Sequence, residues 1–231
     1  MKRLLFCMLT AFLLAAFATS ASADGIQAFS NFSIIEKDGK CGILDSDGKL
    51  ILPIEYYIPE DQFDPGEEYV CVEVYQPTDG DYNITDLDWE LDRGTVKAGF
   101  FHTGSGYFSQ CIWWDVWVSD QYAAVCTDED HYSLLNAETG EAILSGNQYA
   151  WIYPFVTENW IYVWLWPEEI DEDIGPIWET VYINLDGTIL TAPEGCWFSE
   201  ECELVEDGMV PVYSGTGDAV WMSVEELLNG D

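Results

Sequence analysis

The chain has 231 residues, of which 43 are Asp or Glu and seven are Lys or Arg, and its formal net charge at pH 7 is −36. A field of this sign repels phosphate backbones and anionic lipid headgroups, so nucleic acids and membrane surfaces are poor partners. The length is enough for one all-β domain or two small ones with a buried core.

The first 23 residues follow the pattern of a secretory signal peptide. Lys2 and Arg3 precede an apolar run over 4–18, and small residues follow as far as Ala23. This run is too short to cross a membrane, and no later stretch reaches about 18 uninterrupted apolar residues. We therefore expect cleavage between Ala23 and Asp24. The mature chain would be secreted or held in the cell envelope, extracellular or periplasmic, with no membrane span.

The stretch over 37–53, KDGKCGILDSDGKLILP, predicts three consecutive antiparallel strands. Two turn signals, Asp38-Gly39 and Asp47-Gly48, separate short apolar runs, and the last run stops at Pro53. Asp-Gly suits tight hairpins because glycine tolerates a positive φ and the Asp side chain bonds to nearby backbone.

The same order of features recurs three more times along the chain. Each pass has a strand-like run, a turn glycine, aromatic residues and a closing strand rich in β-branched and aromatic residues. The acidic segments over 77–93 and 167–177 are insertions between units, and we expect them in loops on one side of the array. The turn glycines are Gly48, Gly106, Gly140 and Gly187, and the closing strands are expected over 69–75, 122–126, 160–164 and 208–213.

The fold class that follows is all-β, with tandem degenerate units of antiparallel hairpins or meanders. The β-repeat domain is expected over 24–214, and each unit buries its apolar face against its neighbours, either in an open stack or in a propeller-like ring. Residues 215–231 form a C-terminal cap, because Ser223 and Glu226 have capping-box spacing and predict a short helix. The four units are placed at about 32–76, 95–127, 130–166 and 178–214.

The first and fourth passes resemble the WG-containing repeat of bacterial proteins. KDGKCGILDSDGKLILPIEYY follows the repeat pattern, with Cys41 where the tryptophan is expected, and the fourth pass matches through YINLDGTIL and VEDGMVPV. The resemblance implies a repeated β-structure that serves as an interaction scaffold of undefined ligand. It carries over no catalytic residues.

The aromatic content supplies the candidate ligand-binding residues. The chain has 11 Trp and 13 Tyr, and in an exported protein such rings can stack on sugar faces, so a carbohydrate-binding module is the alternative function. The other interpretation is that these rings fill the repeat core. The expected partner is a protein or a glycan outside the cell. The candidate residues are Trp113, Trp114, Trp117, Trp151, Trp160 and Trp164.

Other chemistry has fewer candidates. Asp171, Glu172 and Asp173 are candidate ligands for a weakly bound calcium ion, and no other cofactor is expected. Six cysteines follow the signal peptide, and Cys196 and Cys202, which flank a five-residue loop, form the candidate disulfide. No nucleophile elbow, HExxH motif or phosphate loop is present, so we expect no enzyme activity. A hydrolase with paired carboxylates is the third alternative.

Overall fold

The computed structural model describes residues 25–59, 69–78, 96–127, 131–167, 178–198, 205–215 and 219–229. Within them the chain is almost entirely β, with small antiparallel sheets and no closed barrel, which confirms the expected fold class. The chain divides into two compact halves, residues 1–112 and 113–231. The predicted signal peptide, the candidate calcium ligands and Cys202 lie outside the described residues.

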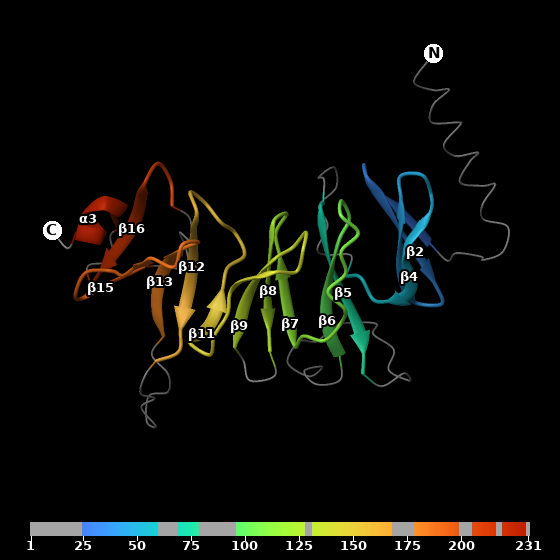
Figure 1. Cartoon of the computed structure of the whole chain (residues 1–231), viewed down its shortest axis with the longest axis horizontal. Helices are drawn as coiled ribbons and strands as arrows, with labels where there is room; N and C mark the ends of the chain where they lie inside the picture. Colours follow the sequence, from blue (N-terminus) through green and yellow to red (C-terminus); the bar gives the residue numbers. More distant parts are fainter. Residues whose placement is uncertain are drawn as a thin grey trace, which may run out of the picture. The chain divides into compact units, whose positions relative to one another are not determined.

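The first sheet, blue in Figure 1, has four strands in sequence order. The predicted meander over 37–53 is confirmed, because its strands pair through two tight turns. Asp38 and Gly39 adopt positive φ angles of 52° and 73°, and Gly48 has a φ of 79°. The strands are β1 (Gly25–Ala28), β2 (Phe32–Lys37), β3 (Lys40–Asp45) and β4 (Leu50–Tyr56).

The second sheet belongs to the same half and has two long strands, β5 (Cys71–Pro77) and β6 (Val96–His102). Isolated bridges add Tyr57 beside β5 and Phe108 beside β6, so the order of four strand positions repeats that of the first sheet. A core lies between the two sheets, and Cys41 is buried in it. The buried members of this core are Phe32, Ile34, Cys41, Ile43, Leu52, Ile58, Val72, Val74 and Phe101.

The C-terminal half contains the third, fourth and fifth sheets, drawn from green through orange to red in Figure 1. The fourth sheet separates two cores. In its strand β12, Ile161 and Val163 join the core shared with the third sheet, whereas Trp160 and Tyr162 join the core shared with the fifth, as strand alternation requires. The third sheet contains β7 (Asp115–Val118), β8 (Tyr122–Cys126), β9 (Tyr132–Asn136) and β10 (Ala142–Leu144). The fourth contains β11 (Tyr149–Ile152), β12 (Trp160–Leu165), β13 (Glu179–Asn184) and β14 (Ile189–Leu190), and the fifth contains β15 (Cys196–Trp197), β16 (Met209–Ser214) and β17 (Ala219–Ser223).

The sheets are out of phase with the repeat units expected from the sequence. The predicted unit over 130–166, for example, supplies β9 and β10 to the third sheet and β11 and β12 to the fourth. The acidic insertions consequently connect the second and third strands of one sheet, β5 to β6 and β12 to β13, rather than two separate sheets. The predicted strands occur in the predicted order, but each sheet begins about half a unit away from where the predicted unit begins.

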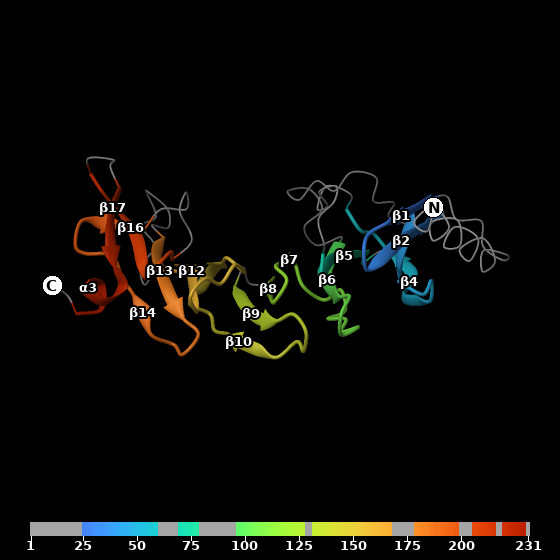
Figure 2. The same cartoon turned by 90° about the horizontal axis from the view of Figure 1, so that it is seen from above.

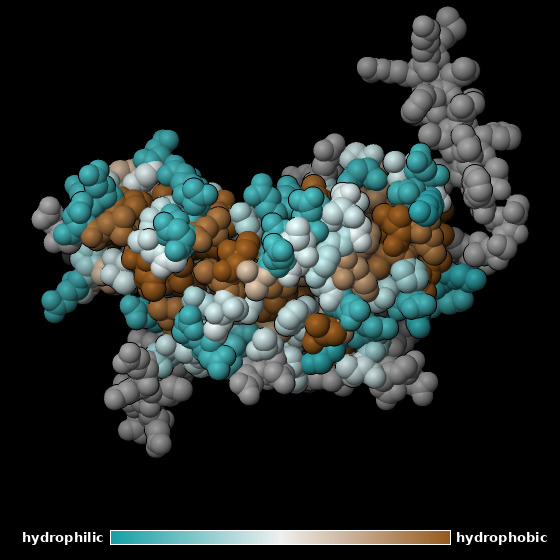
Figure 3. Space-filling view, in the orientation of Figure 1, coloured by the Kyte–Doolittle hydropathy of each residue, from teal (hydrophilic) through white to brown (hydrophobic). Residues whose placement is uncertain are grey.

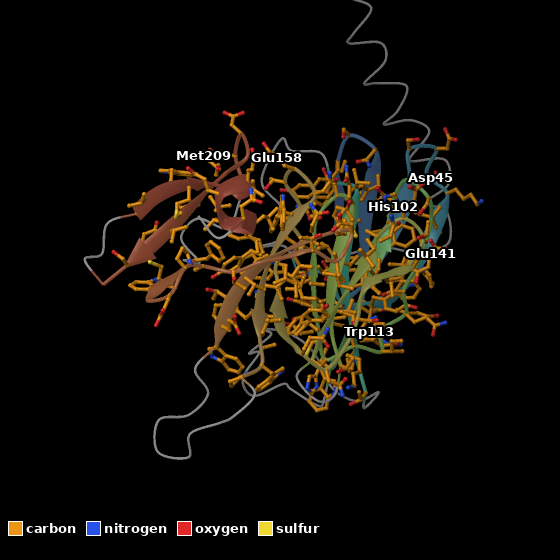
Figure 4. The ribbon with its side chains drawn as sticks, turned by 60° about the vertical axis from the view of Figure 1, so that its left-hand side comes forward. Asp45, His102, Trp113, Glu141, Glu158 and Met209 are labelled. Carbon is orange, nitrogen blue, oxygen red and sulfur yellow. The ribbon has the colours of Figure 1, made fainter. Side chains whose placement is uncertain are left out.

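The turn after the third strand of each of the first four sheets is built in the same way. The last residue of the strand points a side-chain acceptor at a backbone N–H of the turn, and a glycine with a φ between 74° and 92° completes it. This confirms the four predicted turn glycines as equivalent features. The acceptors are Asp45, His102, Asn136 and Asn184, and the glycines are Gly48, Gly106, Gly140 and Gly187. Figure 4 labels Asp45 and His102.

At two positions inside third strands, a side chain would collide with neighbouring backbone, so only glycine fits. A Cβ on Gly42 would lie 2.7 Å from the Leu52 carbonyl oxygen, and one on Gly99 would lie 2.4 Å from the Gln110 carbonyl oxygen. Both carbonyls belong to the segment that follows in the fourth-strand position. The glycine of the Cys41-Gly42 pair therefore permits a close backbone approach within the first sheet.

The last described element is helix α3 (Val224–Asn229), which follows β17 directly. The predicted capping box is confirmed: the Ser223 hydroxyl accepts a hydrogen bond from the Glu226 N–H at 3.1 Å, and the Ser223 N–H donates to the Glu226 carboxylate at 3.0 Å. Val224 and Leu227 pack onto the core between the fourth and fifth sheets. Figure 2 shows α3 beside β17 and β14.

Candidate binding surface of the C-terminal half

The six predicted tryptophans do not form one surface. Trp160 is only 7% exposed and belongs to the core between the fourth and fifth sheets, where Trp164 also packs. Trp114 and Trp151 pack against the core between the third and fourth sheets. Trp113, which Figure 4 labels, is partly buried just before β7. Most of these rings therefore contribute to packing, as the core interpretation of the aromatic residues expected.

Trp117 is the most exposed of the six, with 36% of its surface accessible. Its ring lies 5.2 Å from that of Trp151 and 5.3 Å from that of Tyr153, measured between centroids. The planes are inclined by 69° and 44°, so the three rings do not form a flat platform. A single sugar ring could stack on Trp117, but the inclined neighbours would not extend that contact.

A second aromatic group joins the third and fourth sheets. The His131 ring lies 5.8 Å from Trp166, and Trp166 packs edge-on against Trp178 at 4.6 Å. The indole N–H groups of Trp164 and Trp166 are buried and find no acceptor among the described residues. His131 lies just before β9, Trp166 just after β12 and Trp178 just before β13, so the three rings lie beside the connections that join these strands.

The fifth sheet carries two aromatic residues that the sequence analysis did not single out. Val210, Val212 and Met222 face the core shared with the fourth sheet. Pro211, Tyr213 and Trp221 therefore point to the opposite face, because neighbouring strand residues alternate. Trp197 lies directly opposite Tyr213 and shares this outer face. Trp197 and Trp221 are 45% and 48% exposed.

No other described sheet of the C-terminal half covers this outer face, although Pro211 at its centre is buried. Tryptophan is highly buried on average, and contiguous exposed apolar patches often mark interaction surfaces. In the view of Figure 3, hydrophobic side chains are visible over the fourth and fifth sheets, between hydrophilic ones. We refer to Trp197, Tyr213 and Trp221 as the outer aromatic face.

The charge of the C-terminal half is one-sided. All seven Lys and Arg residues lie at or before Lys97, so residues 113–231 contain 25 Asp and Glu and no Lys or Arg. Within this half no carboxylate can pair with a Lys or Arg of its own. Some are held by backbone N–H groups instead; Glu158, for example, accepts a hydrogen bond from the Gly208 N–H at 2.8 Å. Figure 4 shows Glu158 near Met209, at the turn that precedes β16.

The shifted pKa values do not favour acid–base or nucleophilic chemistry. Hydrogen bonds from Thr188 lower the pKa of Asp186, and hydrogen bonds from Ser223 lower that of Glu226. A general acid would need the opposite shift. Burial raises the pKa of the Cys111 thiol to about 12, which keeps it protonated. Burial, with Asp115 beside it, also raises the pKa of Tyr132, whose hydroxyl donates to the Asp115 carboxylate at 2.7 Å.

Metal and membrane features can be judged only for the described part of the chain. There, His, Cys, Asp and Glu side chains do not gather in groups of three that could hold a metal ion. The described helix is too short and too polar to cross a membrane. The candidate disulfide cannot be placed, because Cys202 lies outside the described residues, while Cys196 is partly buried on β15.

No protein-family model and no curated protein matches the chain. Among solved structures it is similar to the computationally designed Ika8 protein, with a TM-score of 0.36 and 9% identity over 87% of this chain and 58% of Ika8. The designed Ika4 protein gives a TM-score of 0.30 with 8% identity over 88% and 92% of the two chains. BamB from Moraxella catarrhalis gives 0.26 with 13% identity over 86% and 73%. At these TM-scores the likenesses carry no argument about function.

Proposed function

We propose that this chain is a non-enzymatic, exported β-repeat scaffold that binds a protein partner through the outer aromatic face of its fifth sheet. One observation carries the proposal. Trp197 and Trp221 lie on the same face of the last sheet, and each keeps nearly half of its surface exposed. Tryptophans of this kind are frequent anchors of protein interfaces.

The size of the effect limits what the two rings can do alone. Covering the exposed half of both side chains would remove roughly 200 Å² of mostly apolar surface from water, worth about 5 kcal/mol at about 25 cal/mol per Å². Association costs a comparable amount, about 4–15 kcal/mol. The outer aromatic face therefore supplies an anchor, and a stable complex needs further contacts around it.

The resemblance to WG repeats supports the scaffold role. Gly42 of the Cys41-Gly42 pair and Gly99 occupy equivalent positions, three residues before the turn acceptors Asp45 and His102. In both sheets the missing Cβ makes room for the next backbone segment. We accordingly propose that the units are degenerate WG-type repeats. Export depends on cleavage near Ala23, which N-terminal sequencing of the secreted chain would test.

The test of the binding role is a comparison of three baits. The mature chain, a Trp197→Ser/Trp221→Ser variant and an Ile26→Ser/Leu50→Ser variant are used to capture partners from the culture of the source organism, with and without calcium. Ile26 and Leu50 are similarly exposed but lie on the first sheet. We expect the wild type and the first-sheet variant to retain a partner that the tryptophan variant loses. An identical captured set for all three baits would refute the proposal.

A carbohydrate-binding role is the second candidate, and Trp117 is the observation that favours it. Its ring is exposed and is held in place by Trp151 and Tyr153. A glycan array would give a signal that Trp117→Ala abolishes and Trp221→Ala leaves unchanged. A signal insensitive to Trp117→Ala would remove this site from consideration.

A further inference from the structure

The fifth sheet differs from the other four in its edge. In the first four sheets the third strand is paired on both sides: β3 with β4, β9 with β10, β13 with β14, and β6 through the Phe101–Phe108 bridge. In the fifth sheet the third strand, β17, pairs with β16 and with no other described strand. Helix α3 follows where a glycine turn and a fourth strand follow elsewhere.

The hydrogen-bond pattern identifies the groups that face away from β16. The Val224 N–H donates to the Gly208 carbonyl at 2.9 Å, which is one bond of a hydrogen-bonded pair at the end of the ladder, while the Gly208 N–H donates to Glu158 instead. Antiparallel pairs alternate between bonded and non-bonded. Val210 therefore bonds to Met222 and Val212 to Val220, whereas Pro211 and Trp221 face each other without ladder bonds. Pro211 fits this position because it has no N–H to donate.

The outward backbone groups of β17 are consequently those of Ala219, Trp221 and Ser223. The capping box uses the Ser223 N–H, which agrees with this assignment. The N–H and C=O groups of Ala219 and Trp221 have no partner among the described residues. Both residues are exposed, as is Val220 between them at 61%. The edge is therefore accessible, with the Trp221 ring beside it.

The negative charge of the C-terminal half indicates which kind of strand could bind at the β17 edge. No Lys or Arg occurs in residues 113–231, and the described neighbours Glu206, Asp207 and Glu225 are exposed carboxylates. A second copy of the same half would bring only more negative charge to the edge. A strand rich in Lys or Arg would be attracted, and its cations could also stack on the Trp221 indole.

We infer that the open edge of β17 accepts an extended, Lys- or Arg-rich segment of a partner protein as a fourth strand of the fifth sheet. This inference rests on the proposed binding role and names the chemical class of the partner. Backbone hydrogen bonds to Ala219 and Trp221 give the pairing, and alternate side chains of the added strand reach the outer aromatic face. The added strand restores the four-strand pattern of the third and fourth sheets.

The test uses a short synthetic peptide in which Lys and Val alternate, titrated into the mature chain. One control peptide has the same sequence with two adjacent central amides N-methylated, which blocks both edges of the peptide but leaves its charge unchanged. A second control replaces Lys by Glu. We expect the Lys peptide to bind about tenfold more tightly than its N-methylated form, since the methylated amide that faces β17 loses its hydrogen bond and its methyl group keeps the two strands apart. The Glu peptide should not bind.

Two variants locate the effect. Ala219→Pro removes one outward N–H at the start of β17, where proline is tolerated, and should weaken binding of the Lys peptide while the Trp221 groups keep part of its advantage over the N-methylated form. Trp221→Thr keeps the outward N–H and should preserve that advantage while weakening both peptides. Amide spectra in each case show whether β16 and β17 remain paired.

The outcomes separate the two proposals. Equal binding of the Lys peptide and its N-methylated form would overturn the edge inference, since charge alone would then explain binding. Amide hydrogen exchange with the Lys peptide bound is a second readout. New protection at other amides, without protection of Ala219 and Trp221, would overturn the edge inference as well. Loss of partner capture in the Trp197/Trp221 variant would still support the binding role in that case. The opposite result is also informative. If the Lys peptide pairs with β17 but the Trp197/Trp221 variant still captures the partner, the proposed role of the outer aromatic face is wrong and the edge inference stands.

Discussion

The fourth and fifth sheets are built from the same strand order but are used differently. The fourth sheet has a core on each face, and its third strand is paired on both sides. The fifth has a core on one face, Trp197 and Trp221 on the other, and a third strand, β17, that pairs with β16 alone among the described strands. The comparison teaches that the same meander can pack a core on both faces, as the fourth sheet does, or leave one face and its third strand open among the described residues, as the fifth does.

The largest expected effect tests the buried side of this comparison. Ile161 is fully buried between the third and fourth sheets. Ile161→Ala should lower the free energy of unfolding by about 3 kcal/mol, because it removes buried methylenes and leaves a cavity. Trp221→Ala, at the outer face, should change it by less than about 0.5 kcal/mol. Urea unfolding measures both, and equal losses would contradict the distinction between the two sheets.

The next effect concerns the close backbone approach beside a third strand. Gly99→Ala places a Cβ 2.4 Å from the Gln110 carbonyl oxygen, and we expect a loss of about 2 kcal/mol from overpacking. Gly215→Ala, just after β16, meets nothing within 4 Å and serves as the matched control. Thermal unfolding of the two variants should separate them clearly. A Gly99→Ala protein as stable as wild type would show that the fourth-strand segment is not held there.

The smallest effect is the pH dependence of α3. Hydrogen bonds from Ser223 lower the folded-state pKa of Glu226. A lowered pKa means that the capping box contributes fully above the unfolded pKa of about 4.3 and is lost as the pH falls through the folded value. We expect the first turn of α3 to fray as the pH falls below about 4. Amide exchange of the Glu226 N–H would measure this fraying. An α3 equally protected at acid and neutral pH would contradict the assignment.

Local turn chemistry made much of the fold predictable. Asp-Gly pairs, isolated glycines and the Ser223–Glu226 spacing are short-range signals, and the hairpins and the cap follow from them. The phase of the repeat was not predictable in the same way. Pairing of β5 with β6, and of β12 with β13, spans long acidic segments, and no local residue pattern specifies which strands meet across them.

The candidate site was harder to predict, because exposure depends on which sheet faces have a neighbouring sheet, and no local residue pattern specifies this. Trp160 and Trp164 stood out as a dense aromatic run, yet they pack against the core between the fourth and fifth sheets. Trp197 and Trp221 are isolated in the sequence and were missed. Two signals were nevertheless present: no glycine turn follows β17, and no Lys or Arg follows Lys97.

Residue-resolved amide hydrogen exchange on the free protein tests the comparison most directly. Tyr182 in β13 and Trp221 in β17 occupy equivalent positions, two residues before the end of the third strand. We predict that all β13 amides from Val181 to Asn184 are protected, because its two partner strands take them alternately. In β17, Val220 and Met222 should be protected while Ala219 and Trp221 exchange rapidly. Uniform protection along β17 would contradict an open edge on the fifth sheet.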